Sequence, residues 1–141
     1  MSIANPPPLV RSAPIVYDSL VPGECLGSTQ LAVDADMLRQ WHAVYGYTPE
    51  GQTLPLAFAP LLLMRAMLTI AAPRPPGNLH VGQGYRIFRM PRRDDSIVAQ
   101  VTCRSKEIRK QRRVVELETT LSETLGDEPI VVGRSAIFWA Q

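Results

Sequence analysis

The first regular pattern along the chain is a set of apolar residues at helical spacing. Between Asp34 and Gly46 they recur every three or four positions, at Met37, Leu38, Trp41, Val44 and Tyr45. Asp34 carries an oxygen suited to an N-cap, and glycine commonly follows the end of a helix. We therefore predict a short amphipathic helix between these two residues. A turn at Tyr17–Glu24 and a short strand around Leu31 and Val33 precede it.

A second apolar segment, Leu56–Ala72, is hydrophobic on nearly every face and carries one charge, Arg65. A membrane span needs about twenty apolar residues and is destabilised by a central arginine, so a helix enclosed by protein explains the segment better. Pro60 suits the first helical turn, where its missing N–H costs little. Pro73 and the following Pro75–Gly77 end the helix.

Beyond this helix the hydrophobic period becomes two. Ser96–Arg104 and Val114–Ser122 each place alternate side chains on one face. The residues on these faces are Ile97, Ala99, Val101 and Cys103 in the first segment, and Val115, Leu117, Thr119 and Leu121 in the second. His80–Met90 and Ile130–Trp139 are predicted as two further strands. The basic turn Arg109–Arg112 joins the first pair.

These elements predict the fold class. A strand and a short helix, one enclosed helix and four long antiparallel strands form packed layers only if the sheet curls around the apolar helix. We therefore predict an α+β hotdog fold, an antiparallel β-sheet wrapped around one central apolar helix. The 141 residues suffice for one such domain. We place it at residues 17–141, after a proline-rich arm at residues 1–16.

The composition is that of an ordinary globular protein, since 45% of the residues are hydrophobic and 20% are charged, which argues against long disorder. Cys25 and Cys103 lie far apart in unrelated contexts, unlike a disulfide framework or a metal site, so we expect free, buried thiols. The N-terminus lacks a positive region followed by an apolar core, and no secretory signal is expected. We expect a cytoplasmic protein with no metal, cofactor or membrane partner.

Several segments, in their order along the chain, are similar to one protein family. They are the opening Tyr17–Glu24, the helix start Val33–Met37, the helix end Ala43–Gly46 and the strand His80–Pro91. With them the similarity extends over about Tyr17 to Trp139. The chain in this respect resembles the MaoC-like hydratases and dehydratases, a branch of the hotdog proteins that includes (R)-specific enoyl-CoA hydratases.

The resemblance implies a dimer in which paired sheets form a tunnel for the pantetheine arm of an acyl-CoA or acyl-carrier thioester. Members of the family hydrate a trans-2-enoyl thioester reversibly. An Asp just after the helix-ending glycine and a His a few residues later activate the water. Backbone N–H groups at the start of the central helix polarise the thioester carbonyl. A carboxylate–imidazole pair and a helix N-terminus suit these roles.

The chain departs from the family pattern where this chemistry is expected. Tyr47 follows Gly46 where the family has Asp, and no His occurs between Val44 and Leu79. Where the family often has Ala-His-Gly-Met, this chain has Ala57–Pro60, so proline replaces one N–H at the start of the helix. The hydration machinery is therefore incomplete in this chain.

Tyr47 and Glu50 are the candidate catalytic residues. Glu50 is the only carboxylate between Asp36 and Asp94, and it lies in the loop where the chemistry is expected. It is either an acid or base, or a solvated surface glutamate. Tyr47 either donates a hydrogen bond to a thioester oxygen or packs its ring at the mouth of the tunnel.

Phe58, Ala59 and Arg65 are the candidate substrate-binding residues. Phe58 and Ala59 stand at the start of the central helix. A buried guanidinium at Arg65 needs an anion or several carbonyls. We therefore expect Arg65 either to form a structural pair, or to lie beside an interface carboxylate, or to bind a substrate phosphate. His42 and His80 have no carboxylate nearby in sequence and are expected to be structural.

Positive charge is concentrated in Arg86–Arg113, which holds ten of the 15 Lys and Arg residues. This run is a solvated hairpin face, or it binds the phosphates of a CoA nucleotide through the fork geometry of arginine. Nucleic acid is the least favoured ligand, because Arg104–Arg113 offers neither a groove-reading element nor stacking aromatics. We therefore expect no nucleic-acid partner.

Two functions from different classes remain open. In the favoured one, the chain is a subunit without the Asp/His dyad that shapes an acyl-thioester tunnel for a catalytic hotdog partner. In the other, it is a self-sufficient enoyl-thioester hydratase or a thioesterase that uses Glu50 and Tyr47. Hotdog thioesterases usually have Glu or Asp on or near the central helix, and Leu56–Ala72 has neither. The expected partners are an acyl-CoA or acyl-carrier thioester and a second hotdog chain, identical or different.

Overall fold

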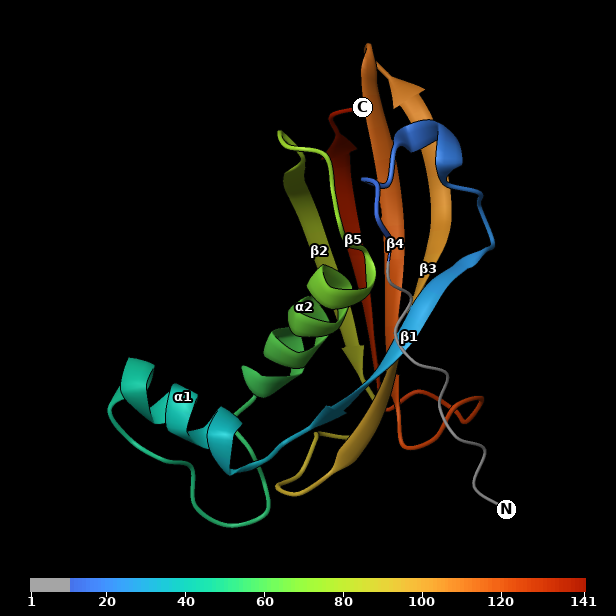
Figure 1. The fold of residues 1–141 in the computed structure, drawn as a ribbon. Coiled ribbons are helices and arrows are strands. Elements are labelled where there is room, and N and C mark those ends of the chain that lie inside the picture. The colour runs from blue at the N-terminus through green and yellow to red at the C-terminus, as the bar shows by residue number, and fades with distance from the viewer. Residues whose placement is uncertain (1–10) are drawn as a thin grey trace.

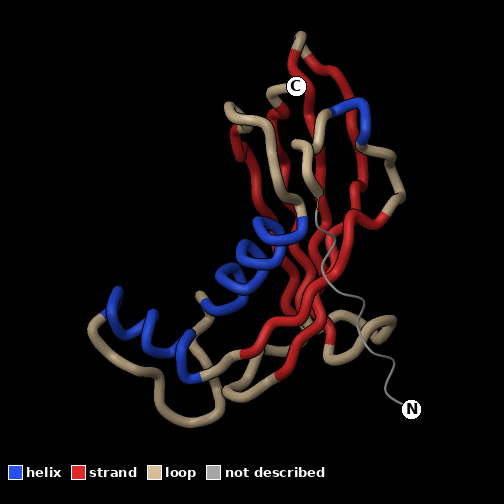
Figure 2. Tube along the Cα trace, viewed as in Figure 1, coloured by secondary structure: helices blue, strands red, loops and turns tan. Residues whose placement is uncertain are grey.

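A computed structural model describes residues 11–141 and shows one antiparallel sheet with two α-helices (Figures 1 and 2). The elements in chain order are the short 3-10 helix η1 (Tyr17–Ser19), β1 (Cys25–Ala32), α1 (Ala35–Tyr45), α2 (Phe58–Ile70), β2 (Leu79–Ile87), β3 (Ser96–Arg109), β4 (Arg112–Ser122) and β5 (Val131–Trp139). The strands are ordered β1-β3-β4-β5-β2, and α2 packs on the sheet. The predicted α+β hotdog fold is confirmed.

Helix α1 begins and ends where the sequence predicts. The Asp34 side chain accepts a hydrogen bond from the Met37 backbone N–H at 3.0 Å, which satisfies one donor of the first turn. Gly46 adopts the left-handed conformation with φ 78° and donates its N–H to the His42 carbonyl. Met37, Leu38 and Trp41 form the buried side of α1. The hydrophobic spacing therefore predicted the helix and the first part of its buried face, whereas Val44 and Tyr45 of the same stripe are 74% and 58% exposed.

Helix α2 is shorter than predicted and is enclosed on one side only. It spans Phe58–Ile70 rather than Leu56–Ala72. Its sheet-facing side is buried and consists of Phe58, Ala59, Leu62, Leu63, Ala66, Met67 and Ile70. On the opposite side Leu68 is 44% exposed. The expectation of a fully enclosed helix is corrected here, because α1 projects away from the sheet instead of covering this side (Figure 1).

Strands β3 and β4 have the predicted alternation. All four inward residues of β3 and the corresponding four of β4 are buried, including the hydroxyl-bearing Thr119. Burying a large aliphatic side chain contributes about 1.5–3 kcal/mol. These two strands and β5 therefore provide the wall against which α2 is held.

Gly133 on β5 lets α2 approach the sheet closely. A Cβ at this position would lie 2.8 Å from Cδ1 of Leu63, a buried side chain of α2. Real carbon contacts at this distance are repulsive, so the neighbour must move if the glycine is replaced. Gly133 therefore fixes how near the helix and the sheet come to each other.

Two arginines bind the C-terminal carbonyl groups of α2. Nη1 of Arg11 donates to the carbonyls of Ile70 at 2.6 Å and Ala72 at 3.2 Å. Nη1 of Arg74 donates to the carbonyls of Leu68 at 3.2 Å and Ala71 at 3.1 Å. Cations at this end complement the negative pole of the helix.

Residues 11–16 contact the sheet domain. Ile15 is buried, donates its N–H to the Pro73 carbonyl at 2.9 Å and accepts from the indole N–H of Trp139 at 2.8 Å. Residues 1–10 of the predicted arm lie outside the described residues. The division into an arm at 1–16 and a domain at 17–141 stays a proposal.

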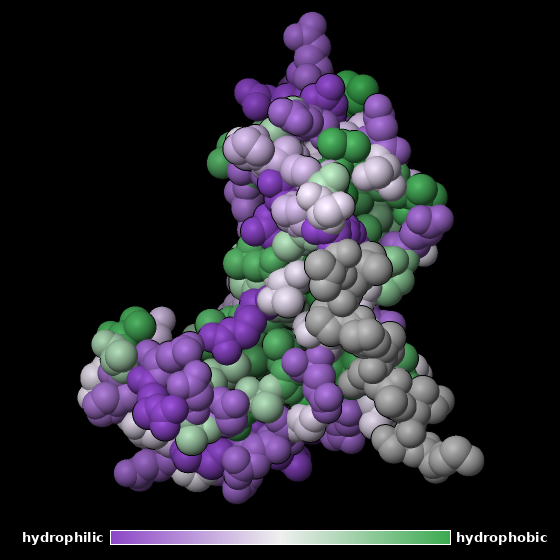
Figure 3. Space-filling view, in the orientation of Figure 1, coloured by the Kyte–Doolittle hydropathy of each residue, from purple (hydrophilic) through white to green (hydrophobic). Residues whose placement is uncertain are grey.

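The space-filling view shows an angled surface, with α1 forming an arm that leaves the main body (Figure 3). Hydrophobic side chains gather at the free end of this arm and in the angle beside it. Val44 at that end is 74% exposed, and Leu56 before α2 is 68% exposed. Within residues 11–141, none of the helices has the length and apolarity needed to cross a membrane.

Gly133→Ala tests the close approach of α2. The added Cβ meets Leu63, and overpacking of this kind costs about 1–3 kcal/mol of folding stability. Urea unfolding followed by circular dichroism measures the loss. Gly84→Ala is the matched control, because a Cβ at Gly84 has nothing within 4 Å. Equal stability of the two variants would contradict the assigned role of Gly133.

Substitutions in the turn of the β3–β4 hairpin are expected to stabilise the fold. Lys110 and Gln111 form its two-residue turn with φ values of 49° and 66°, a conformation that costs non-glycine residues about 1–2 kcal/mol each. Replacing the pair by Asn-Gly is expected to raise the free energy of unfolding by roughly 1 kcal/mol. The same urea titration measures it, and an unchanged or lower midpoint would show that the turn is not strained.

Candidate functional site

The loop from Tyr47 to Pro55, which connects α1 to α2, is held by the β2–β3 connection. The guanidinium of Arg93 donates to the carbonyls of Pro49 and Gly51, and the distance to Gly51 is 3.1 Å. The Arg93 backbone N–H donates to the Gln52 carbonyl at 3.1 Å. Arg93 therefore fixes the backbone on both sides of Glu50. Sequence analysis missed this residue because its partners are more than forty positions away.

The two candidate catalytic side chains of this loop differ in their contacts. Tyr47 is 48% exposed and packs edge-to-face on Trp41, with ring centroids 6.2 Å apart. Glu50 is exposed and forms neither a hydrogen bond nor an ion pair with any residue from 11 to 141. No hydrogen bond therefore links Glu50 to Tyr47, and the catalytic roles of both stay predictions.

An aromatic stack joins α1 to the start of α2. The Trp41 ring lies between Tyr45, at a centroid distance of 4.2 Å, and Phe58, at 4.4 Å. Such pairs contribute about 0.5–1.5 kcal/mol beyond the area they bury. Phe58 and Ala59 are both 0% exposed. They form the floor under this stack, and their predicted contact with substrate is untested.

The first N–H groups of α2 are already used within the chain. Phe58 donates to the Pro55 carbonyl at 3.0 Å, and Ala59 donates to the Leu56 carbonyl at 3.2 Å. Pro60, the next residue, has no N–H. The carbonyl-polarising donors that the family resemblance implies are thus satisfied or missing at residues 58–60.

A groove of about 240 Å³ lies between α1 and α2. Its lining residues are Met37, Gln40, Trp41, Val44, Tyr45, Ala57, Leu61 and Arg65. Arg65 is half-buried and donates to Oε1 of Gln40 at 3.0 Å. The partner of Arg65 is thus a neutral amide. No carboxylate among residues 11–141 forms an ion pair with Arg65, so the anion considered in the sequence analysis is not supplied by this part of the chain.

Neither histidine lines this groove. Nδ1 of His42 is 3.1 Å from the hydroxyl of Thr48, and Nε2 of His80 is 2.9 Å from the Gly82 carbonyl. Neither ring pairs with a carboxylate of the described part of the chain. In particular, neither forms an acid–base dyad with Glu50.

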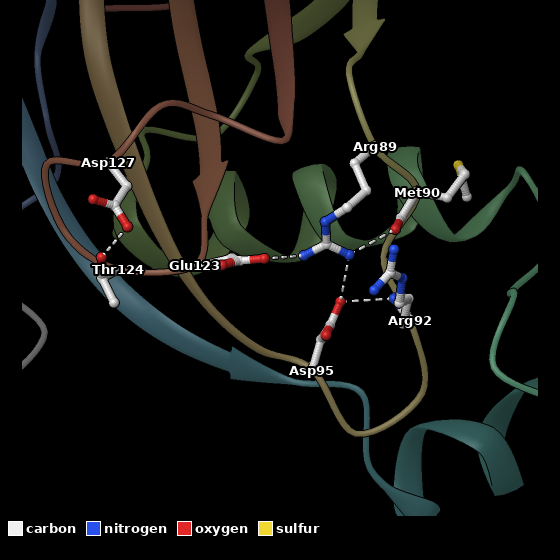
Figure 4. A network of polar contacts seen from close by, with 7 residues as sticks. All are labelled: Arg89, Met90, Arg92, Asp95, Glu123, Thr124 and Asp127. Atoms are coloured by element: carbon white, nitrogen blue, oxygen red, sulfur yellow. Dashed lines mark hydrogen bonds and ion pairs between the residues drawn. The ribbon is translucent and has the colours of Figure 1, made fainter.

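The positive run Arg86–Arg113 divides between two ends of the sheet. At one end Arg89 pairs with Asp95 at 3.1 Å and with Glu123 at 2.8 Å, and it donates to the Met90 carbonyl (Figure 4). Asp95 also accepts from the Arg92 N–H at 2.7 Å. This network ties the β2–β3 connection to the β4–β5 loop. Arg89 is therefore neutralised by two carboxylates, and the network holds the loop that carries Arg93.

The cysteines are free, as predicted, but only one is buried. Burial raises the pKa of the Cys103 thiol, and nearby Lys106 partly opposes this effect. Cys103 therefore stays protonated and is a poor nucleophile. Cys25 is exposed on the edge strand β1, which corrects the expectation that both thiols are buried. Among residues 11–141 no three His, Cys, Asp or Glu side chains cluster to hold a metal ion.

Comparison with known proteins gives a fold but no sequence relative. No protein-family model matches the chain, and no curated protein matches its sequence. Among solved structures, the unliganded R-hydratase PhaJ1 from Pseudomonas aeruginosa has a TM-score of 0.69 at 18% identity, over 91% of this chain and 87% of that chain.

Two further solved structures point the same way. The MaoC-like dehydratase from Rhodospirillum rubrum has a TM-score of 0.70 at 14% identity, over 90% of this chain and 98% of that chain. The HadBC complex, a 3R-hydroxyacyl-ACP dehydratase from Mycobacterium tuberculosis, has a TM-score of 0.58 at 16% identity, over 77% of this chain and 89% of that chain. The chain therefore has the hotdog fold, in the form found in MaoC-like dehydratases and (R)-hydratases.

Proposed function

We propose that this chain is an acyl-thioester-binding hotdog subunit that lacks its own hydration machinery and pairs with a catalytic hotdog chain. The observation that carries the proposal is the start of α2. There the N–H groups of Phe58 and Ala59 are bonded to Pro55 and Leu56, and Pro60 has none. The adjoining loop has Tyr47 after Gly46 and no His. The acid–base pair and the carbonyl-polarising donors that the resemblance implies are thus both missing from the start of α2 and the loop before it.

Pairing with a second chain is supported by the edge strand β2. An edge strand carries unpaired backbone donors and acceptors that another strand can bind. Leu79, Val81 and Tyr85 on β2 and Phe88 just beyond it are between 43% and 62% exposed. Large apolar side chains along an open edge fit an interface better than solvent.

The position of α1 supports a shared site. The arm formed by α1 leaves the body on the side where β2 lies (Figure 1). A chain paired along β2 would lie in the angle between this arm and the open side of α2, beside the groove. The thioester would then bind between the two chains, and the partner would supply the acid–base pair. The HadBC dehydratase of Mycobacterium tuberculosis is likewise a complex.

A self-sufficient hydratase or thioesterase is the second candidate. The observation in its favour is that Arg93 holds the backbone on both sides of Glu50, which leaves the carboxylate exposed on a fixed loop. Fixed carboxylates with free oxygens can act as general bases. In this candidate Glu50 activates the water and Tyr47 donates to the thioester oxygen. Neither side chain contacts the other, so we place this function second.

Assays of the purified chain with crotonyl-CoA separate the two functions. If the subunit proposal holds, the purified chain hydrates crotonyl-CoA no faster than buffer does, as measured by the absorbance of the enoyl thioester. Adding the thioester is also expected to raise the melting temperature of the chain. Hydration that Glu50→Gln abolishes, while Glu128→Gln in another exposed loop does not, would establish the second candidate instead. An unchanged melting temperature would remove thioester binding from the proposal.

The β2 edge is tested by Tyr85→Lys. A charge introduced at a paired apolar edge is expected to weaken association at least about tenfold, the equivalent of ~1.4 kcal/mol. Light scattering over a dilution series measures the change in mass. Ile108→Lys is the control, since Ile108 is also exposed but lies near the far hairpin. If both variants associate as the parent chain does, β2 is not the interface.

A further inference from the structure

The groove between α1 and α2 contains a positive charge, on Arg65, that no carboxylate of residues 11–141 neutralises. It is lined mainly by apolar side chains, with the polar ends of Gln40 and Arg65 among them. The guanidinium of Arg65 has five N–H donors, and one hydrogen bond, to Oε1 of Gln40, is made within residues 11–141. No carboxylate of the described residues lies within 4.0 Å of it. A half-buried cation without a counter-charge is costly, so an anion that reaches it is stabilised.

A donor on the opposite wall, the indole N–H of Trp41 on α1, has no partner among residues 11–141. Trp41 lines the groove and is 7% exposed. Buried donors are almost always bonded in folded proteins. The other tryptophan, Trp139, follows that rule and donates to the Ile15 carbonyl. The groove therefore combines an apolar lining with the Arg65 guanidinium, and the unbonded indole N–H of Trp41 is buried in its wall.

We propose that this groove binds a short-chain or medium-chain aliphatic carboxylate, whose tail lies along Met37, Val44 and Leu61 and whose carboxylate pairs with Arg65. This goes beyond the proposed function, because it requires neither a thioester nor a partner chain. A free acid of this kind is what hydrolysis of an acyl thioester releases.

The chemistry of the groove selects this ligand class. A single guanidinium matches the single charge and two oxygens of a carboxylate, which it binds through a bidentate fork. A phosphate carries more charge than one arginine neutralises, and Arg65 is the only cationic residue among the described residues that line the groove. The volume of about 240 Å³ is below the range of about 300–1,000 Å³ usual for drug-sized ligands, which favours a short tail.

Octanoate is the probe, and the two indole N–H signals in a nitrogen–proton NMR spectrum of the full chain are the readout. Octanoate is expected to shift the Trp41 signal in a saturable way and to leave the Trp139 signal in place. Octanol, with the same tail and no charge, is expected to bind about tenfold more weakly or worse. Trp139→Phe assigns the signals.

Arg65→Met tests the pairing, since methionine keeps an unbranched apolar side chain and removes the charge. It is expected to weaken octanoate binding at least about tenfold and to leave octanol binding unchanged. Arg65→Lys, which keeps the charge without the fork, is expected to lie between the two. Their circular dichroism melts show whether each variant is folded.

Three outcomes would overturn the inference. If octanol binds as tightly as octanoate, the groove does not recognise the charge of the ligand. Arg65→Met with undiminished octanoate binding would place the carboxylate elsewhere. If the binding of octanoyl-CoA depends on Arg65 and octanoate does not bind, the groove is assigned to the thioester. The last outcome supports the proposed function and removes only this inference, so the two can fail separately.

Discussion

The fold depends on packing one side of α2 against the sheet. Leu62, Leu63 and Met67 pack into the wall made by β3, β4 and β5, and Gly133 allows the closest contact. Arg11 and Arg74 satisfy carbonyls at the far end of the helix. The helix is therefore fixed at both its buried face and its C-terminus. Its other side is partly exposed, with Leu68 44% exposed.

That arrangement determines what the candidate site can do. At the N-terminal end the aromatic stack on Trp41 and the turn at Pro55–Phe58 take up the positions and donors that a hydratase would use. The same contacts keep the loop, the arm α1 and the groove in place. In the proposed function this frame holds an acyl ligand, and Tyr47 and Glu50, the candidate catalytic residues, form no hydrogen bond with each other. Function is argued from this site and not from the fold, since one fold can carry many activities.

Local patterns in the sequence predict the elements well. Helix α1, its caps at Asp34 and Gly46, and the buried faces of β3 and β4 all follow from spacing and from the chemistry of neighbouring residues. The apolar run around α2 predicts a helix, but it does not show which side another element covers. The position of α1, which decides this, depends on packing between residues distant in sequence.

The site is less predictable for the same reason. Arg93 reaches the loop at Pro49, and Arg65 meets Gln40 on another helix, so neither partner is visible from neighbouring residues. The exposure of Cys25 depends on its place at the sheet edge. The sequence does show which residues are missing, because the Asp and His of the resembled family have fixed places beside Gly46. That absence is a local property, and it supports the functional proposal beside the hydrogen bonds at the start of α2.

The most direct test is the composition and activity of the native assembly, purified from its source under non-denaturing conditions and weighed by native mass spectrometry. The account predicts a complex of this chain with a different hotdog chain, and hydration of crotonyl-CoA that is lost when the acid–base residues of that other chain are replaced. A homodimer of this chain alone that hydrates crotonyl-CoA would contradict it.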